Sequence, residues 1–233
     1  MNSVFAVVVA GGKGERMHAR IPKQYLMLDD LPILTRTLLA FSDIPAVEKI
    51  YLAVPETDFG YCRESILPAV QDIISVTLVP GGVDRQGSVR SGLCAIPSEQ
   101  GIVAIHDGVR PFVPVRQTEK AIALATTEGA CILGIPTKDT LKKVDEQGVI
   151  SETINRATIW QAQTPQVFGL QLIRQAHEFA VSTGFAGTDD ASLVEHFGGR
   201  VRMIPGSPFN IKITEPEDLE LARGILGYID YRV

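Results

Sequence analysis

The run from Val4 to Lys23 joins an apolar segment directly to a glycine-rich loop. Val4–Ala10 is rich in valine and bounded by glycine, which predicts a central parallel strand covered on both faces. Gly11, Gly12 and Gly14 follow at once, and glycine lets backbone N–H groups approach an anion closely. The segment therefore predicts an α/β fold with an anion-binding loop after its first strand.

Three cations accompany this loop: Lys13, Arg16 and Lys23. A P-loop has a lysine and a hydroxyl residue after its last glycine, where this chain has Glu15. A dinucleotide-binding fingerprint has a third glycine where the chain has Met17. A turn without a ligand is the alternative interpretation, but the added positive charge favours a site for a nucleotide triphosphate.

Composition excludes several classes of protein. The chain has 233 residues, of which 45% are hydrophobic and 21% charged, so we expect a single domain over 1–233. A net charge of −5 argues against the broad basic surface that nucleic-acid binding requires. No cationic leader precedes the first apolar run, which is far shorter than the roughly 20 residues that cross a bilayer. We therefore expect a cytoplasmic protein with no membrane or nucleic-acid partner.

The cysteines give no sign of a disulfide or a metal site. Cys62, Cys94 and Cys131 are dispersed, odd in number and without paired spacing. We expect buried free thiols.

Short apolar segments alternate with helical patterns as far as Ile135. The predicted strands are Val4–Ala10, Ile50–Val54, Ser75–Val79, Ile102–His106 and Cys131–Ile135. The predicted helices are Ile33–Phe41, Tyr61–Leu67, Arg85–Ala95 and Arg116–Glu128. This rhythm predicts a Rossmann-like, mostly parallel sheet with helices on both faces.

The alternation stops at Pro136–Trp160, a polar segment with two strand-like pieces around a turn. It predicts a protruding β-hairpin arm. Because an isolated hairpin is marginal in water, we expect residues 136–160 to pair with the same arm of a second subunit. A hairpin folded back on its own domain is the alternative.

Helical and strand patterns resume after the arm. The predicted elements are helices at Leu170–Thr183 and Asp189–His196, strands at Val201–Ile204 and Ile211–Ile213, and a last helix from Glu215. Thr214 and Glu217 have the spacing of a capping box, and Pro216 suits a first helical turn.

Several polar residues follow strands at one edge of the predicted sheet, where ligands bind in open α/β folds. Gly82 and Ser88 flank the start of a helix and could hold a base or ribose. Asp107 directly follows a buried strand, a position suited to a carboxylate that binds a divalent cation, although a turn former is the alternative. His106 is predicted to be structural, and Lys212 could return to the same edge.

Seven segments together resemble a known family. They are AGGKGERM with the following PKQ, GGVDRQGSV, HDGVRP, PTKDT, TINRATIWQAQTPQ, TDDAS and NIKIT. In this order they resemble the 2-C-methyl-D-erythritol 4-phosphate cytidylyltransferases, whose fold is of the nucleotide-diphospho-sugar transferase type. The resemblance runs from about Val4 to Ile225 and so covers nearly the whole chain.

The resemblance implies an activity and a cofactor. Members transfer CMP from CTP to the phosphate of methylerythritol phosphate, release pyrophosphate and need Mg²⁺. In-line attack on the α-phosphorus depends chiefly on positioning and on neutralising charge. The implied partners are CTP and a small polyol phosphate, and the homodimer expected from the arm agrees with a small-molecule enzyme of this kind.

The resemblance also implies roles for individual residues. The catalytic cations would be Arg16, Lys23, Arg156 and Lys212. The nucleotide would be held by Ala10, Gly11, Gly12, Gly14, Gly82, Arg85, Ser88 and Asp107. The acceptor would be bound by Asp107, Arg110, Thr140, Arg156, Thr188 and Lys212, and the metal by Asp107.

The chain departs from many relatives in a few positions. Gly11, Gly108 and Val109 stand where alanines are frequent, and Phe209 stands where some members have an acidic residue, so a second carboxylate for the metal is doubtful. A ribitol 5-phosphate cytidylyltransferase and a non-catalytic nucleotide-binding domain are the alternative functions.

Overall fold

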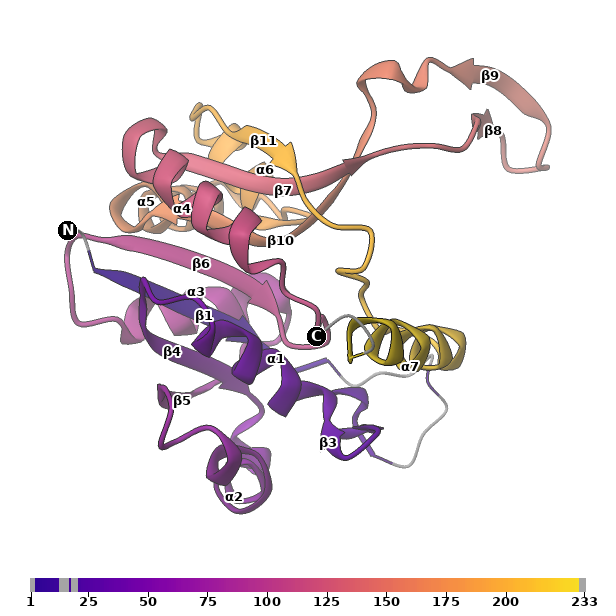
Figure 1. Cartoon of the computed structure of the whole chain (residues 1–233). Helices are drawn as coiled ribbons and strands as arrows, with labels where there is room; N and C mark the ends of the chain where they lie inside the picture. The colour runs from indigo at the N-terminus through magenta and orange to yellow at the C-terminus, as the bar shows by residue number, and fades with distance from the viewer. Residues whose placement is uncertain (1–2, 13–16, 18–20, 231–233) are drawn as a thin grey trace.

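The computed structural model describes residues 3–12, 17 and 21–230. Its centre is a seven-stranded sheet in the order β11-β7-β10-β6-β1-β4-β5 (Figure 1). The strands are β1 (Val4–Val9), β4 (Val47–Val54), β5 (Ser75–Pro80), β6 (Ile102–Asp107), β7 (Ala130–Pro136), β10 (Trp160–Gly169) and β11 (Arg202–Pro205). Only β10 runs antiparallel to its neighbours, so the predicted mostly parallel sheet is confirmed.

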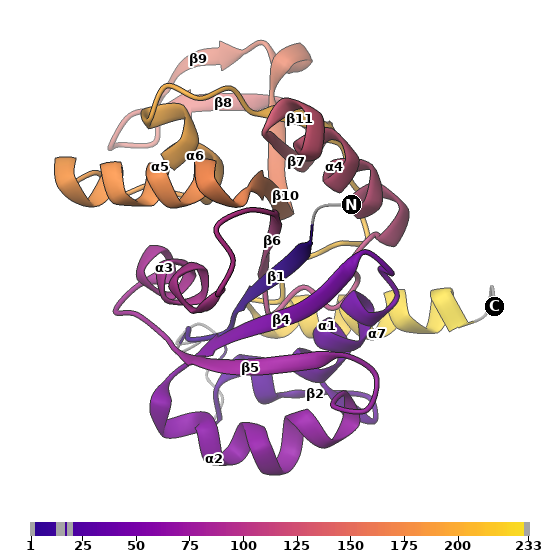
Figure 2. The same cartoon turned by 90° about the vertical axis from the view of Figure 1, so that its left-hand side faces the viewer.

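Helices cover both faces of this sheet (Figure 2). The long helices are α1 (Ile33–Ser42), α3 (Arg85–Ala95), α4 (Val115–Glu128), α5 (Leu170–Thr183) and α7 (Pro216–Asp230), and α6 (Asp190–His196) is shorter. Helices α1 and α4 pack on the face to which Ala6 and Val8 point, whereas α3, α5 and α6 pack on the face of Phe5 and Val7. Strand β1 is therefore buried on both sides, as its unbroken valine run predicts.

A smaller apolar cluster fastens α7 to the body of the protein. It contains Leu28, Ile33, Val109, Ile213, Ala222 and Leu226. Leu28 lies in the short ribbon of β2 (Met27–Leu28) and β3 (Leu31–Pro32). The cluster brings the chain after Asn210 back to the loop that follows β6, where the Ile213 N–H donates to the Val109 carbonyl.

Most predicted boundaries agree with the structure, and α3 and α5 have the predicted ends. The predicted helix at 61–67 is a run of short turns: α2 (Phe59–Tyr61), a π-turn (Cys62–Ile66) and a 3-10 turn (Leu67–Ala69). Two further 3-10 turns are Lys23–Tyr25 and Glu56–Asp58.

Three predictions near the C-terminal end of the chain were wrong. Ile211–Ile213 is not a strand. The capping box does not involve Glu217, because the Asp218 carboxylate accepts from the backbone and hydroxyl of Thr214. Asp189 is the N-cap of α6 and not its first helical residue.

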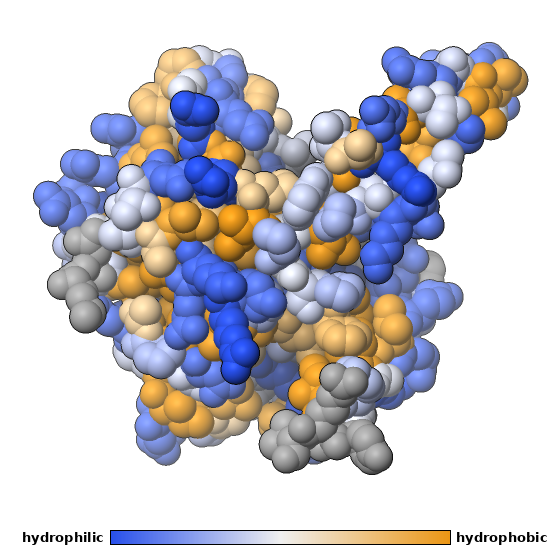
Figure 3. Space-filling view, turned by 45° about the horizontal axis from the view of Figure 1, so that its top comes forward, coloured by the Kyte–Doolittle hydropathy of each residue, from blue (hydrophilic) through white to orange (hydrophobic). Residues whose placement is uncertain are grey.

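The predicted arm is present. Beyond β7 and before β10 the chain forms β8 (Leu141–Val144) and β9 (Ile150–Ile154), which pair only with each other and project away from the sheet (Figure 1). A 3-10 turn, Arg156–Thr158, leads back to β10. Val144, Val149 and Ile150 are exposed on the arm, and Figure 3 shows hydrophobic surface near its tip.

Two of the three cysteines are buried as expected. Cys94 is exposed on α3, so the expectation was wrong for that thiol. None of the helices in the described part of the chain has the length and apolar character needed to cross a membrane.

Candidate active site

The carboxyl ends of β1, β4, β5 and β6 meet at one edge of the sheet because these strands run parallel. Gly11 and Gly12 follow β1 at this edge. A Cβ added to Gly12 would lie 3.9 Å from Cε of Lys23, so the lysine stem lies against the glycine loop. The backbone of Ala10 is anchored to β4, since its N–H donates to the Ala53 carbonyl at 2.9 Å.

The loop after β5 is closed by its own hydrogen bonds. The Gly82 N–H donates to Oγ of Ser88 at 3.0 Å, and this hydroxyl donates to the Asp84 carbonyl at 2.8 Å. A Cβ at Gly82 would lie 2.5 Å from the carbonyl carbon of Gly87, so only glycine fits there. Ser88 is buried and thus holds the loop after β5 from its inner side.

Three cations converge on the carboxylate of Asp107 at the end of β6. Nε of Arg85 lies 3.0 Å from Oδ1, while Nζ of Lys212 lies 3.0 Å and Nε of Arg110 lies 3.4 Å from Oδ2. These side chains come from α3, from the segment before α7 and from the loop after β6. A buried carboxylate among three cations marks a concentrated positive centre at the ligand edge of the sheet.

The charges of this cluster perturb one another strongly. Burial would raise the pKa of Asp107, but Arg85, Lys212 and Arg110 outweigh burial and hold that pKa well below its usual range. Burial lowers the pKa of Arg110, an effect that Asp107 only partly offsets. Asp107 is therefore ionised at any physiological pH and available as a fixed anion or as an oxygen ligand.

Thr164 of strand β10 holds the backbone of Asp107 in place through a hydrogen bond. The Asp107 N–H donates to Oγ1 of Thr164 at 3.1 Å, and that hydroxyl contacts Nδ1 of His106 at 3.0 Å. Nε2 of His106 lies 3.0 Å from the Arg110 carbonyl. Nδ2 of Asn210 donates to the Thr164 carbonyl at 2.7 Å. His106 is thus a buried, hydrogen-bonded structural residue, as predicted.

Comparison with known proteins decides the family. The IspD family model, 2-C-methyl-D-erythritol 4-phosphate cytidylyltransferase, matches residues 4–228. The chain is 47% identical over 229 residues to the enzyme of that name from Geotalea uraniireducens, covering 97% of this chain and 98% of the relative. It is also 47% identical over 225 residues to the one from Syntrophotalea carbinolica, covering 96% of each.

The chain belongs to this family. It is a cytidylyltransferase of the non-mevalonate isoprenoid pathway. The crystal structure of 4-diphosphocytidyl-2C-methyl-D-erythritol synthase from Anaerococcus prevotii superposes with a TM-score of 0.85 at 30% identity, covering 97% of this chain and 96% of that chain. The arm and the sheet order are accordingly features of a cytidylyltransferase fold.

The remaining predicted site residues of this cytidylyltransferase lie in three places. Lys13, Gly14 and Arg16 fall outside the described residues. Thr140 and Arg156 are exposed on the arm, where Nη1 of Arg156 donates to the Lys138 carbonyl. Thr188 is exposed just before α6. Within the described part of the chain, no hydrogen bond or ion pair joins these threonines or Arg156 to the Asp107 cluster.

One charged residue beside the Asp107 cluster was missed in the sequence. Asp190, the first residue of α6, accepts from Nη1 of Arg85 at 2.7 Å and contacts Nε2 of His177 at 3.3 Å. Burial raises the pKa of Asp190, yet the net shift is downward because Arg85 and His177 outweigh it. The available signal was the pair of adjacent aspartates in TDDAS, of which one caps the helix and the other is free to face inward.

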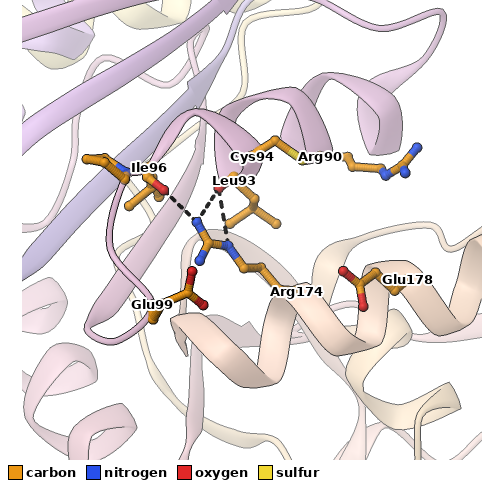
Figure 4. A pocket seen from close by; sticks show the side chains of 8 residues that line it. Arg90, Leu93, Cys94, Ile96, Glu99, Arg174 and Glu178 are labelled. Carbon is orange, nitrogen blue, oxygen red and sulfur yellow. Dashed lines mark hydrogen bonds between the residues drawn. The ribbon is translucent and has the colours of Figure 1, made fainter.

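A separate pocket of about 400 Å³ lies at the opposite end of α3, between α3 and α5 (Figure 4). Arg174 projects from α5 into this region and donates to the carbonyls of Leu93 and Ile96. It also donates to the carbonyl of Ser98. The guanidinium thus caps the last turn of α3, and the pocket contains none of the predicted site residues.

Proposed function

We propose that CMP is transferred from CTP to the phosphate of 2-C-methyl-D-erythritol 4-phosphate at the Asp107 cluster and the adjoining glycine loop. The convergence of Arg85, Arg110 and Lys212 on Asp107 carries the proposal, because it concentrates positive charge where a nucleoside triphosphate and a phosphate monoester must meet. The family relationship supports this chemistry, and the position at the carboxyl edge of the sheet agrees with it.

The triphosphate is proposed to be bound mainly by backbone N–H groups. Ala10, Gly11, Gly12 and Gly14 would present N–H groups to the triphosphate, in the manner of other glycine-rich anion cradles. Across the edge, Gly82 and Ser88 form the closed loop that would hold the nucleoside, and Arg85 would face the phosphates. Lys23 lies against the glycine loop, because its Cε would be 3.9 Å from a Cβ added to Gly12.

The transfer step needs little covalent participation from the protein. An oxygen of the acceptor phosphate forms a bond to the α-phosphorus while the bond from that phosphorus to the β-phosphate oxygen breaks, and the electron pair leaves with pyrophosphate. Arg16 and Lys23 would stabilise the charge that grows on the phosphoryl oxygens. Losing one such donor typically costs about 3–4 kcal/mol of transition-state stabilisation.

A magnesium ion fits this site with CTP present. Among residues 3–12, 17 and 21–230, no group of three or more His, Cys, Asp and Glu side chains forms a metal cluster. Mg²⁺ is commonly held by one or two carboxylates together with substrate phosphates, which suits the single carboxylate of Asp107. The ion would supply positive charge to the phosphoryl oxygens.

The acceptor side is proposed to require a second subunit. Lys212 and Arg110 lie at the Asp107 cluster, whereas Thr140 and Arg156 lie on the projecting arm. If residues 136–160 pair with their counterpart, the partner's arm could bring its threonine and arginine to the acceptor phosphate, whose charge suits a guanidinium fork. Thr188 would complete the pocket from the segment before α6.

The experiment that tests the function is an acceptor panel. The purified chain, CTP and Mg²⁺ are combined with methylerythritol phosphate or ribitol 5-phosphate, and pyrophosphate release is measured. We expect kcat/KM to favour methylerythritol phosphate by at least roughly tenfold, about 1.4 kcal/mol of differential transition-state binding. An equal or reversed preference would assign the chain to pentitol phosphates, and no release with either acceptor would indicate a non-catalytic protein.

A further inference from the structure

We propose that Asp190 is a positioning residue for the transfer reaction, which it serves by fixing the guanidinium of Arg85 beside Asp107. The proposal rests on the proposed function of the Asp107 cluster. It adds a residue that neither the glycine loops nor the cation pattern of the sequence indicates.

The guanidinium of Arg85 spans two carboxylates that come from distant parts of the chain. Its Nε lies 3.0 Å from Oδ1 of Asp107, and its Nη1 lies 2.7 Å from Oδ2 of Asp190, a residue 105 positions away. Two charge-assisted bonds from different nitrogens fix both the position and the rotation of a planar group. Asp107 alone, which is bonded to Nε only, would leave the guanidinium free to turn.

Asp190 is itself held rigidly, so it can act as an anchor. Its side chain is 1% exposed. Its N–H donates to Oε1 of Gln166 at 3.1 Å, and its second carboxylate oxygen contacts Nε2 of His177 at 3.3 Å. Gln166 belongs to β10, next to the strand that carries Asp107, so the anchor and the site share one sheet.

A neighbouring side chain ties the same two segments together. Gln86 follows Arg85 in the first turn of α3, where its amide donates to the Phe185 carbonyl at 3.3 Å and accepts from the Gly187 N–H at 3.1 Å. The start of α3 and the segment before α6 are therefore joined at two adjacent positions. This junction brings the proposed nucleotide contact Arg85 close to the segment of Thr188.

The third nitrogen of Arg85 indicates what the fixed guanidinium would bind. Nη2 is buried and has no hydrogen-bond partner among the described residues. A buried cationic N–H without an acceptor is costly, and an incoming phosphate oxygen would satisfy it. Asp107 and Asp190 take Nε and Nη1, so Nη2 is the nitrogen left for such a ligand.

Asp190 also balances the charge of the site. Arg85, Arg110 and Lys212 contribute three positive charges against the single carboxylate of Asp107. With Asp190 the five groups sum to +1, and without its charge they sum to +2. Neutralising Asp190 would therefore draw Arg85 onto Asp107 as its one remaining anionic partner and displace it from the nucleotide.

The test compares Asp190→Asn with a matched control, Ser192→Ala. Ser192 belongs to the capping box at the same end of α6, where its hydroxyl donates to the Asp189 carbonyl at 2.7 Å, but it contacts neither Arg85 nor Asp107. Both variants disturb the start of α6, and only Asp190→Asn changes the anchor of Arg85. Thermal unfolding measures how far each variant destabilises the start of α6. Steady-state kinetics and CTP titration calorimetry measure the loss of the contact between Asp190 and Arg85.

We expect Asp190→Asn to lower kcat/KM for CTP by roughly tenfold to a hundredfold, the range expected when a reacting group is misplaced. CTP affinity should weaken as well, whereas Ser192→Ala should stay within about threefold of the wild type. Arg85→Lys should show a similar loss, because an ammonium does not reproduce the fork. In the Arg85→Lys background, Asp190→Asn should cost less than about threefold, since the interaction it removes is already gone.

Several outcomes would overturn the proposal. They are additive losses in the double variant, equal losses in Asp190→Asn and Ser192→Ala, or wild-type kinetics and CTP affinity in Asp190→Asn. If Asp190→Asn does not fold, Arg85→Lys decides alone, and wild-type CTP affinity in that variant refutes the anchor. Failure of the proposed function is distinguishable, because the wild-type chain would then release no pyrophosphate, whereas CTP binding still tests the anchor.

Discussion

The buried imidazole of His106 should make the stability of the protein fall as the solution is acidified from neutral pH. His106 is fully buried on β6 and packs edge-on against Phe41 at 5.2 Å between ring centroids. Nε2 faces the Arg110 carbonyl, which can only accept, so Nε2 carries the proton and Nδ1 accepts from the Thr164 hydroxyl. A second proton on Nδ1 would displace that donor.

The size of the stability loss follows from the shift in the pKa of His106. Burial lowers the pKa of His106 from 6.5 to about 4, while the charges of Asp107, Arg110 and Arg85 act in opposing directions and change it less. Between these two values the unfolded chain binds a proton that the folded chain does not, so stability rises with pH. The full effect is about 3 kcal/mol, of which about 2 kcal/mol is lost between pH 7 and pH 5. The lowered pKa values of Asp107 and Asp190 act below this window, because their stabilisation is lost only as the pH falls through about 4 and lower.

The assay is urea unfolding followed by circular dichroism at fixed protein concentration, without nucleotide or divalent cation, from pH 5 to pH 7.5. His106→Gln is the comparison, since Gln keeps an N–H donor and does not titrate. The variant is expected to be less stable overall, but its free energy of unfolding should lack the fall of about 2 kcal/mol that His106 adds. Parallel curves for the two proteins would refute the reasoning. Nitrogen-15 chemical shifts of the wild-type imidazole give a second test, because a proton on Nδ1 at pH 5.5 would contradict the assignment.

Three further predictions concern other parts of the molecule. Lys23→Gln should lower kcat by roughly a hundredfold to a thousandfold with an unchanged circular dichroism spectrum, and a wild-type kcat at saturating substrates would remove Lys23 from the mechanism. Light scattering should report about twice the chain mass of 25.3 kDa for the wild type and a smaller species for Val144→Asp with Ile150→Asp, which alters two paired arm residues; a fully active wild-type monomer would exclude the proposed pairing of two arms. Arg174→Ala should cost about 1–3 kcal/mol of stability, because the carbonyls at the end of α3 lose their donor, while its kcat, measured by pyrophosphate release, should stay unchanged.

The parts of the fold that were predictable from sequence are those with local causes. The ends of α3 and α5 were correct because a turn and a periodic apolar face define each of them within a few residues of chain. The positions of Gly82 and Asp107 at one edge followed from the parallel direction of β5 and β6. The distances between their side chains were not predictable, since they depend on how α3 packs against the sheet.

Strand β10 was missed because its sequence does not look like the interior of a sheet. Thr164 and Pro165 stand in its middle, and proline is rare in central strands. The structure accommodates them with a register shift, in which pairing with β7 jumps from Gln163 to Gln166. The polar residues have partners outside the ladder: Thr164 contacts His106 and Gln166 binds the start of α6.

The same strand explains why the partners of Asp190 could not be found from local pattern, although the adjacent aspartates of TDDAS marked its position. Its partners Gln166, His177 and Arg85 are separated from it by 24, 13 and 105 residues, so no window of sequence contains them all. The sequence pattern places both aspartates in the predicted helix 189–196 and gives no partner for either side chain. The antiparallel insertion of β10 beside β6 brings the start of α6 to the end of β6, and this placement makes one of the two carboxylates a partner of Arg85 at the carboxyl edge of the sheet.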